Sequence, residues 1–403
     1  MHQLLLGEKS EIRATDETTV NRLLTGSTNR LVCPNLLHLT CYITTVANLR
    51  LIPYFLSPHL TRLTFHDRLS GGYSMGDFFP GLRSTFQAIP TRCLQELTIN
   101  IPAPSMRHLS GEVSSVIQRC GSSLRVLDVP VPLGDAAVRH LSRLKNLKVW
   151  SSIWSPPPAG TSSTSTTFPS LSALVFSRKT AYGWIPWLTQ RGRGSSDAQD
   201  GYLEHAKSNI AHLVFWEPVL IDATFVSPFR HFPNLVTLEV ESGCRVMPGC
   251  SFSLTNQHVM ELSNSLPLLE ELHLGTQCSR NASHVTVACF LALSARCKDL
   301  RSLWIHFNAR NLAEDFRLLS EDPALRELRS LPTRCPLDFF DAGESSFPSG
   351  VSDDDVTTIA KGFLDIFPSL ISIFSADRGW NPLDSRICEL QRTQAAPLVQ
   401  TEA

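Results

Sequence analysis

One short pattern of apolar positions recurs along this chain. It runs apolar, two variable residues, apolar, one variable residue, apolar. The clearest copies begin at Leu60, Leu94, Leu124, Leu171, Ile210, Leu235, Leu269 and Leu300, and weaker ones at Leu36, Leu147, Leu325 and Leu370. Because side chains alternate between the two faces of a strand, each copy predicts a short strand that buries its pattern residues on one face.

The segments between these predicted strands carry helix-start signals. Ser352 is an expected N-cap because Asp355 follows three residues later, ahead of an apolar helical pattern. Asp135 opens a second such segment, and Thr255 precedes a third. The sequence therefore predicts that helices alternate with strands along the chain.

The spacing of the copies identifies the repeat class. Successive copies are 23 to 45 residues apart, and the shorter intervals fall within the roughly 20–29 residues of a leucine-rich repeat. A single unit of this kind cannot bury its apolar face alone, so neighbouring units stack. We predict an α/β fold: a leucine-rich-repeat solenoid, a curved horseshoe with parallel strands inside and helices and loops outside.

The repeats define the expected domain organisation. They occupy residues 33–380, in about 11–12 copies, with an N-terminal cap or remnant at 1–32 and a flexible tail at 381–403. Polar, low-complexity or Ser/Gly-rich stretches predict surface loops at 155–167, 191–201 and 338–352.

Composition narrows the possible partners. The charged share is 18%, below the roughly 25% of an average soluble domain, which suits a continuous apolar spine. Because the net charge is −1, we expect no general attraction to nucleic acid or to anionic membranes. The longest apolar runs fall short of the roughly 18 residues of a membrane span, and residues 1–11 lack a signal-peptide core, so we expect an intracellular, cytoplasmic or nuclear protein.

Two features of the sequence could indicate a metal site or a catalytic site: the cysteines and one serine motif. The 11 cysteines have no Cys-x-x-Cys spacing, so we expect free, mostly buried thiols and neither a metal nor a cofactor. Gly72–Gly76 has the G-x-S-x-G form of a hydrolase elbow around Ser74. The preceding strand is predicted to end at Phe65, and residues 77–80 look like a poor helix start, so we expect an inter-repeat loop rather than an enzyme.

The third, fifth and seventh positions of each repeat are expected to face outward on the concave side. Among them we predict a partner-binding set of His212, Trp216, Glu239, Glu241, Glu271, His273, Trp304 and His306. The two tryptophans are the expected hot spots, unless long loops cover them and make them core residues. The glutamates indicate a basic peptide partner or, equally, a merely solvated face.

Several repeats resemble a known family. Residues 33–41, 232–240, 266–274 and 296–305 look like the repeats of F-box-associated leucine-rich-repeat proteins, and residues 351–374 are similar to the last repeat of large fungal F-box-like families. The resemblance implies a substrate-recognition subunit of an SCF-type ubiquitin ligase, in which an F-box grips the adaptor and the repeats grip the target.

One feature departs from that family: no F-box is recognisable in residues 1–32. An SCF adaptor is therefore expected as a partner only if a divergent F-box exists. The alternative hypotheses are a stand-alone repeat scaffold or inhibitor and, more remotely, a serine esterase that uses Ser74. Outside its complex the chain is expected to be a monomer.

Overall fold

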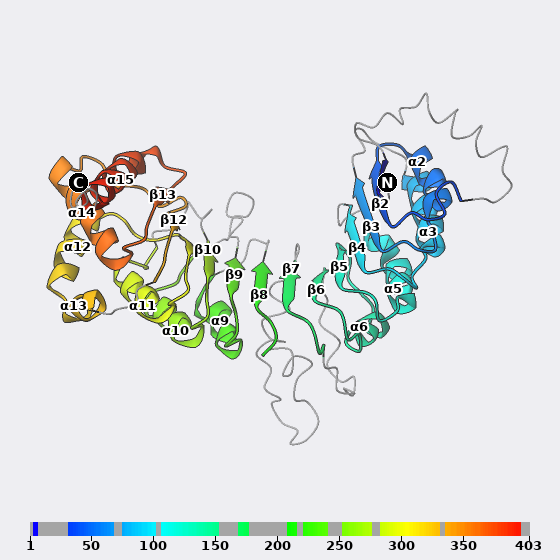
Figure 1. Cartoon of the computed structure of the whole chain (residues 1–403), viewed down its shortest axis with the longest axis horizontal. Coiled ribbons are helices and arrows are strands. Elements are labelled where there is room, and N and C mark those ends of the chain that lie inside the picture. The colour runs from blue at the N-terminus through cyan, green and yellow to red at the C-terminus, as the bar shows by residue number, and fades with distance from the viewer. Residues whose placement is uncertain are drawn as a thin grey trace, which may run out of the picture. The chain divides into compact units, whose positions relative to one another are not determined.

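The computed structural model describes residues 3–6, 31–67, 75–101, 106–152, 168–176, 208–215, 221–240, 252–275, 283–330 and 335–395. They form two compact units, residues 1–209 (unit 1) and 210–403 (unit 2). Within each unit, parallel strands follow one another in chain order and helices connect them (Figure 1). Each of the two units therefore has the predicted leucine-rich-repeat solenoid architecture.

Unit 1 contains seven described strands in an open sheet. They are β1 (Gln3–Leu6), β2 (His38–Ile43), β3 (Arg62–Asp67), β4 (Glu96–Asn100), β5 (Val126–Val129), β6 (Val149–Ser152) and β7 (Ala173–Phe176), each parallel to the next. The described helices of this unit are α2 (Val46–Leu51), η1 (Ile52–Phe55), α3 (Met75–Ala88), η2 (Arg107–Leu109), α5 (Ser110–Arg119) and α6 (Asp135–Leu141).

Unit 2 repeats this arrangement. Its described strands are β8 (His212–Phe215), β9 (Thr237–Val240), β10 (Glu271–Leu274), β11 (Ser302–Ile305), β12 (Phe339–Asp341) and β13 (Ser372–Phe374), again parallel and in chain order. Its described helices are α9 (Ala223–Val226), η3 (Ser227–His231), α10 (Asn256–Ser265), α11 (Ala288–Arg296), α12 (Leu312–Glu321), α13 (Pro323–Ser330), α14 (Asp353–Ile366), η4 (Arg378–Trp380) and α15 (Asn381–Ala395).

The apolar pattern sets the register of the sheet. Leu272 and Leu303 occupy the same position in neighbouring strands, and both are completely buried. The same position is filled by Leu63, Leu97 and Leu127 in unit 1, also completely buried. Each pattern leucine thus packs beneath the equivalent leucine of the next repeat, which gives every unit one continuous apolar core.

One predicted strand is wrong and two were missed: β1 lies in the predicted N-terminal cap or remnant 1–32, and β12 lies in a predicted loop. The copy at Leu325 lies in helix α13, so it is not a strand. Instead, β12 lies inside the predicted loop 338–352, where Leu337, Phe340 and Ala342 match the pattern and are completely buried.

Residues 381–395 of the segment predicted as a flexible tail form helix α15. Leu383 and Ile387 of this helix are completely buried. Asp384 accepts a hydrogen bond from the backbone N–H of Ile373 (2.9 Å), and Gln391 donates one to the carbonyl of Leu370. The helix therefore satisfies backbone groups along the edge strand β13, which would otherwise be open to pairing with another chain.

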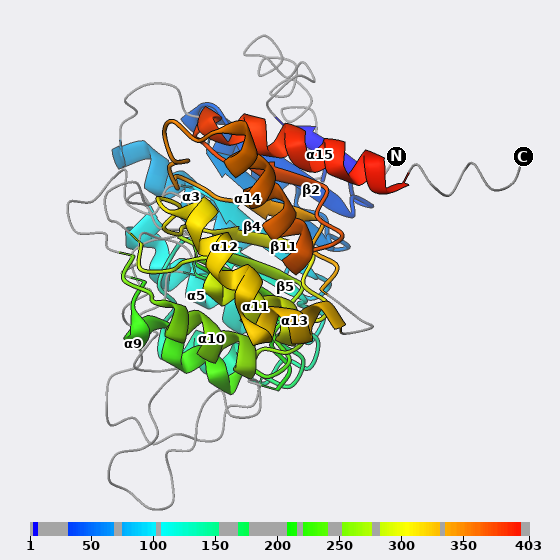
Figure 2. The same cartoon turned by 90° about the vertical axis from the view of Figure 1, so that its left-hand side faces the viewer.

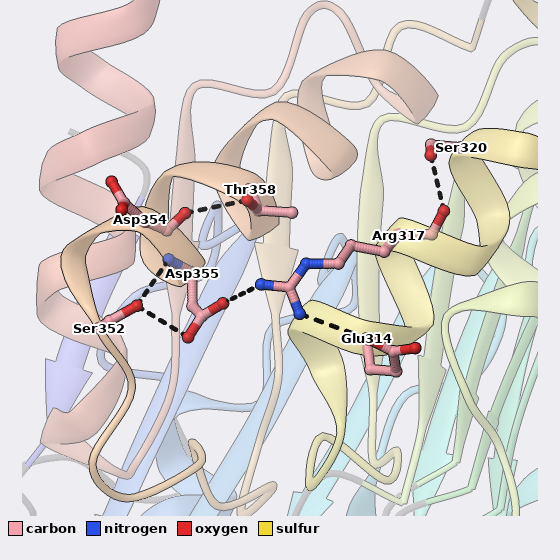
Figure 3. A network of polar contacts seen from close by, with 7 residues as sticks. All are labelled: Glu314, Arg317, Ser320, Ser352, Asp354, Asp355 and Thr358. Atoms are coloured by element: carbon pink, nitrogen blue, oxygen red, sulfur yellow. Dashed lines mark hydrogen bonds and ion pairs between the residues drawn. The ribbon is translucent and has the colours of Figure 1, made fainter.

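All three predicted helix starts are confirmed, and Asp135 is the first residue of α6. Thr255 caps α10 and exchanges hydrogen bonds with His258 in a capping box. Ser352 caps α14, because its hydroxyl accepts a hydrogen bond from the N–H of Asp355 (3.1 Å). The Asp355 carboxylate pairs in turn with Arg317 of α12, which also contacts Glu314 (3.4 Å), so the capped end is tied to the neighbouring repeat (Figure 3).

The other sequence predictions concern the cysteines, the loops, the serine motif and membrane-spanning helices. All cysteines in the described part of the chain are free, and most are buried, as predicted. The loops at 155–167 and 191–201 and the residue Ser74 lie outside the described residues. The expectation that residues 77–80 are a poor helix start is wrong, since helix α3 begins at Met75 and runs through Pro80. None of the described helices is long and apolar enough to cross a membrane.

Candidate functional site: an aromatic row on the sheet of unit 2

The strands of unit 2 present two different faces. In β10 and β11, buried leucine and isoleucine positions alternate with exposed or half-buried ones, as the pleat of a strand requires. The buried positions pack toward the helices, which lie together on one side of the sheet in unit 2 (Figure 2). The alternate positions form the other face, which we call the open face of unit 2.

Four consecutive strands place one ring each on this open face. His273 of β10 stacks on Trp304 of β11, with ring centroids 4.5 Å apart and planes at 15°. Trp304 lies 5.7 Å from Phe339 of β12, and Phe339 stacks on Phe374 of β13 at 4.6 Å and 21°. We call these four residues the aromatic row. Each such contact stabilises by about 0.5–1.5 kcal/mol beyond simple area burial.

The row ends in an exposed ring. Phe374 is 50% exposed, although a large apolar residue gains about 1.5–3 kcal/mol from full burial. Trp304 and Phe339 are half-buried, and each stacks on a ring of the neighbouring strand, Trp304 on His273 and Phe339 on Phe374. The adjacent Ile371, just before β13, is 60% exposed. This edge of the open face therefore offers apolar surface to solvent.

The polar atoms of the first two rings are enclosed. Trp304 Nε1 and His273 Nε2 are buried and have no hydrogen-bond partner in the described part of the chain. Burial lowers the pKa of His273, against the opposing effect of Glu271, so the imidazole is held neutral. These two side chains thus contribute ring surface rather than hydrogen bonds.

A chain of polar contacts adjoins the row. His212 Nδ1 lies 3.1 Å from Thr237 Oγ1, and that hydroxyl contacts the carboxylate of Glu271 at 3.3 Å. His212, Thr237 and Glu271 belong to β8, β9 and β10, and Glu271 is two residues before His273 on the same strand. The two predicted residues His212 and Glu271 are therefore brought together through a threonine that fixes their positions.

Asp341 adds a carboxylate within the row. It is the register partner of Trp304 on one side and of Phe374 on the other. Its Oδ1 accepts a hydrogen bond from the N–H of Gly343 (2.6 Å). Partial burial raises the pKa of Asp341, and the hydrogen bond from Gly343 opposes that rise.

The predicted site residues have different outcomes. His212, Glu271, His273 and Trp304 lie together on the open face of unit 2, and Glu239 is half-buried on the same face. Trp216 and Glu241 lie outside the described residues.

His306 was expected to be exposed, and that expectation is wrong. Its residue exposure is only 5%, its ring meets Phe252 edge-on at 5.6 Å, and its Nδ1 lies 3.4 Å from Ser345 Oγ. Because β11 ends at Ile305, the alternation of the strand no longer governs the next residue.

Sequence reasoning missed Phe339, Asp341 and Phe374. The first two lie on β12, inside the predicted loop 338–352, and the third is the outward-facing fifth position of the weak copy at Leu370. The buried triplet of Leu337, Phe340 and Ala342 was the available signal. Recognising it would have placed Phe339 and Asp341 at outward-facing positions.

Comparisons with known proteins give no family. No family model matches the chain, and no curated protein matches it. Among solved structures the chain is similar to a chain of the yeast Rad7 and Elc1 complex, with 15% identity, a TM-score of 0.35, and coverage of 85% of this chain and 88% of that one. It is also similar to a protein from Bacteroides fragilis, with 11% identity, a TM-score of 0.29 and coverage of 75% and 76%. The assignment of the fold rests on the repeating strands and helices described above.

Proposed function

We propose that this chain is a protein-recognition subunit that holds another protein against the open face of unit 2. The observation that carries the proposal is the aromatic row, which ends in the exposed Phe374 on the open face of unit 2. Aromatic residues are enriched where protein–protein interfaces concentrate their binding free energy. The neighbouring polar chain of His212, Thr237 and Glu271 supplies the hydrogen-bonding groups expected at the margin of such an interface.

The repeats support a more specific form of this proposal. Their resemblance to F-box-associated repeats suggests the substrate-recognition subunit of an SCF-type ubiquitin ligase. A stand-alone scaffold or inhibitor that binds its partner through the same repeats is the second candidate. Both candidates use the same open face and differ only in whether a ligase adaptor also binds.

Affinity capture from the native cells tests both levels of the proposal. The tagged chain is compared with a Trp304→Ala/Phe374→Ala variant and with Tyr42→Ala as a matched control. Tyr42 stacks on His66 at 4.9 Å and 13° on the sheet of unit 1. The Tyr42→Ala variant therefore removes a stacked ring that lies outside the site. Captured proteins are identified by mass spectrometry, and folding of each variant is checked by thermal denaturation.

The expected result is that one or more captured proteins disappear with the double variant and remain with Tyr42→Ala. Loss of such proteins with both variants, or with neither, contradicts a role for the open face of unit 2. Co-purification of a cullin and its adaptor supports the ligase assignment. Capture of other proteins without them supports the scaffold.

A further inference from the structure

We propose that the segment held by the open face of unit 2 presents arginine, whose guanidinium stacks on the aromatic row and pairs with the carboxylates around it. This inference rests on the proposed function and specifies the chemistry of the partner.

Charge on the face and at the starts of its strands is one-sided among the described residues. Strands β9 to β12 and the residues that immediately precede them carry the acids Glu239, Glu270, Glu271, Asp338 and Asp341. Across the same described positions from β9 to β13, the only lysine or arginine is Arg301, which pairs with Asp338 at 3.9 Å. A cationic partner would therefore meet an attractive potential over most of this surface.

The register places a carboxylate among the rings. Asp341 lies between Trp304 and Phe374 on adjacent strands, which are about 4.8 Å apart in a β-sheet. Its Oδ1 is engaged by Gly343, and no hydrogen bond within the described residues uses Oδ2. A planar cation lying against the exposed ring of Phe374 can therefore reach a carboxylate oxygen that has capacity to accept.

The electrostatic state of Asp341 favours a cationic ligand. Partial burial raises its pKa, which means that the charged carboxylate is poorly solvated where it lies. A bound cation supplies the missing stabilisation, and a hydrogen bond from a charged donor is roughly twice as strong as one between neutral groups.

The corresponding face of unit 1 has a different composition. It also carries a stacked pair, Tyr42 and His66, but cationic residues accompany it. Arg62 pairs with Glu96 across β3 and β4, while Arg125 and Lys148 precede β5 and β6 and are exposed. Aromatic stacking on a sheet therefore occurs in both units, whereas stacking within an acidic surface is confined to unit 2 among the described residues.

Arginine fits this surface better than lysine does. The guanidinium is planar, stacks on aromatic rings, and donates two parallel hydrogen bonds to a carboxylate. The ammonium of lysine is a compact, strongly hydrated point charge and loses more hydration on a ring face. Discrimination between the two cations therefore separates specific recognition from simple attraction between opposite charges.

The test measures the anisotropy of fluorescein-labelled oligoarginine with the full chain, against oligolysine of the same length and a neutral Gly/Ser peptide. Titrations are run near physiological ionic strength, where the screening length is about 8 Å. Phe374→Ala and Asp341→Asn probe the site. Asp353→Asn, an exposed acid in the first turn of α14, controls for the loss of one negative charge, and Tyr42→Ala controls for the loss of one ring.

We expect oligoarginine to bind several-fold more tightly than oligolysine, and the neutral peptide not to bind. Phe374→Ala should weaken oligoarginine binding by about 2- to 30-fold, the range expected for loss of one cation–π contact. Asp341→Asn should weaken it to a similar extent, whereas both control variants should bind as the unaltered chain does. Thermal denaturation of each variant verifies that folding is retained.

Equal binding of the two cationic peptides, or equal effects of the site and control variants, overturns the inference. Absence of oligoarginine binding overturns it as well. If affinity capture still depends on Trp304 and Phe374 in that case, the proposed function stands and only the arginine specificity is lost. If capture is also unaffected, both fail together.

Discussion

Replacement of Gly362 by alanine should destabilise unit 2, although alanine is the better helix former. Gly362 lies within α14, where propensity alone predicts a gain of up to about 1 kcal/mol for alanine. An added Cβ, however, would lie 2.2 Å from Cδ1 and 2.5 Å from Cγ of Phe316 on α12. Since carbon atoms pack at about 3.5–4.0 Å, the ring must move by more than an ångström.

The ring of Phe316 has little freedom to move. It is 3% exposed and packs at 5.0 Å against Phe363, which contacts Phe290 and Phe340 in turn. Inserting a group into such packing costs about 1–3 kcal/mol, and expelling the ring would forfeit a comparable burial free energy. After a propensity gain of about 1 kcal/mol, the expected net cost is up to about 2 kcal/mol. For a unit of this size that lowers the melting temperature by up to about 8 °C.

Differential scanning calorimetry of matched variants checks the sign. Gly111→Ala is the control, because this glycine also lies in a helix, α5, and an added Cβ has no neighbour within 4 Å. That control should be neutral or stabilising by up to about 1 kcal/mol. Phe316→Leu combined with Gly362→Ala should recover part of the loss. A melting temperature that rises for Gly362→Ala would refute the close packing of α12 and α14.

Three further predictions concern the sheet edge, the thiols and a buried acid. Asp384→Ala should destabilise unit 2 by about 1–3 kcal/mol in urea denaturation, since Ile373 loses its acceptor, and Asp384→Asn should cost less. Iodoacetamide should label Cys93 well before Cys297, because Cys297 is completely buried and burial raises its pKa to about 12; equal labelling by mass spectrometry would argue against that core. Burial raises the pKa of Asp128 above 3.8, with a smaller opposing effect from Ser151, so the folded state loses stability as the pH rises above 3.8. Asp128→Asn should therefore have little effect near pH 3.8 and raise the melting temperature progressively toward pH 7, and a constant or opposite difference would contradict the shift.

The strands could be predicted where the apolar spacing fits a strand and does not also fit one face of a helix. Leu269, Leu272 and Leu274 combine a three-residue and a two-residue step, and only a strand after a turn buries all three. Leu325 and Leu328 also have the three-residue step, but that spacing equally suits one face of a helix, and α13 is the result. Local sequence does not distinguish these cases, because the outcome depends on packing against neighbouring repeats.

The candidate site was only partly predictable for a related reason. The outward position of Trp304 follows from its place in the repeat. Its stacking on His273 and Phe339 depends on the register of three strands that are distant in sequence. The role of α15 was also not predictable from its polar sequence. It depends on the hydrogen bonds that Asp384 and Gln391 form with the backbone of Ile373 and Leu370, in and just before β13.

Site-directed photo-crosslinking tests the central claim most directly. A photoreactive phenylalanine is placed at Phe374 on the open face of unit 2 or, as the control, at Tyr42 on the sheet of unit 1, and the native cells are irradiated. We expect a discrete adduct with another protein from position 374, its loss when Trp304→Ala is added, and no equivalent adduct from position 42. No adduct from position 374, or the same adducts from both positions, would contradict recognition by the aromatic row.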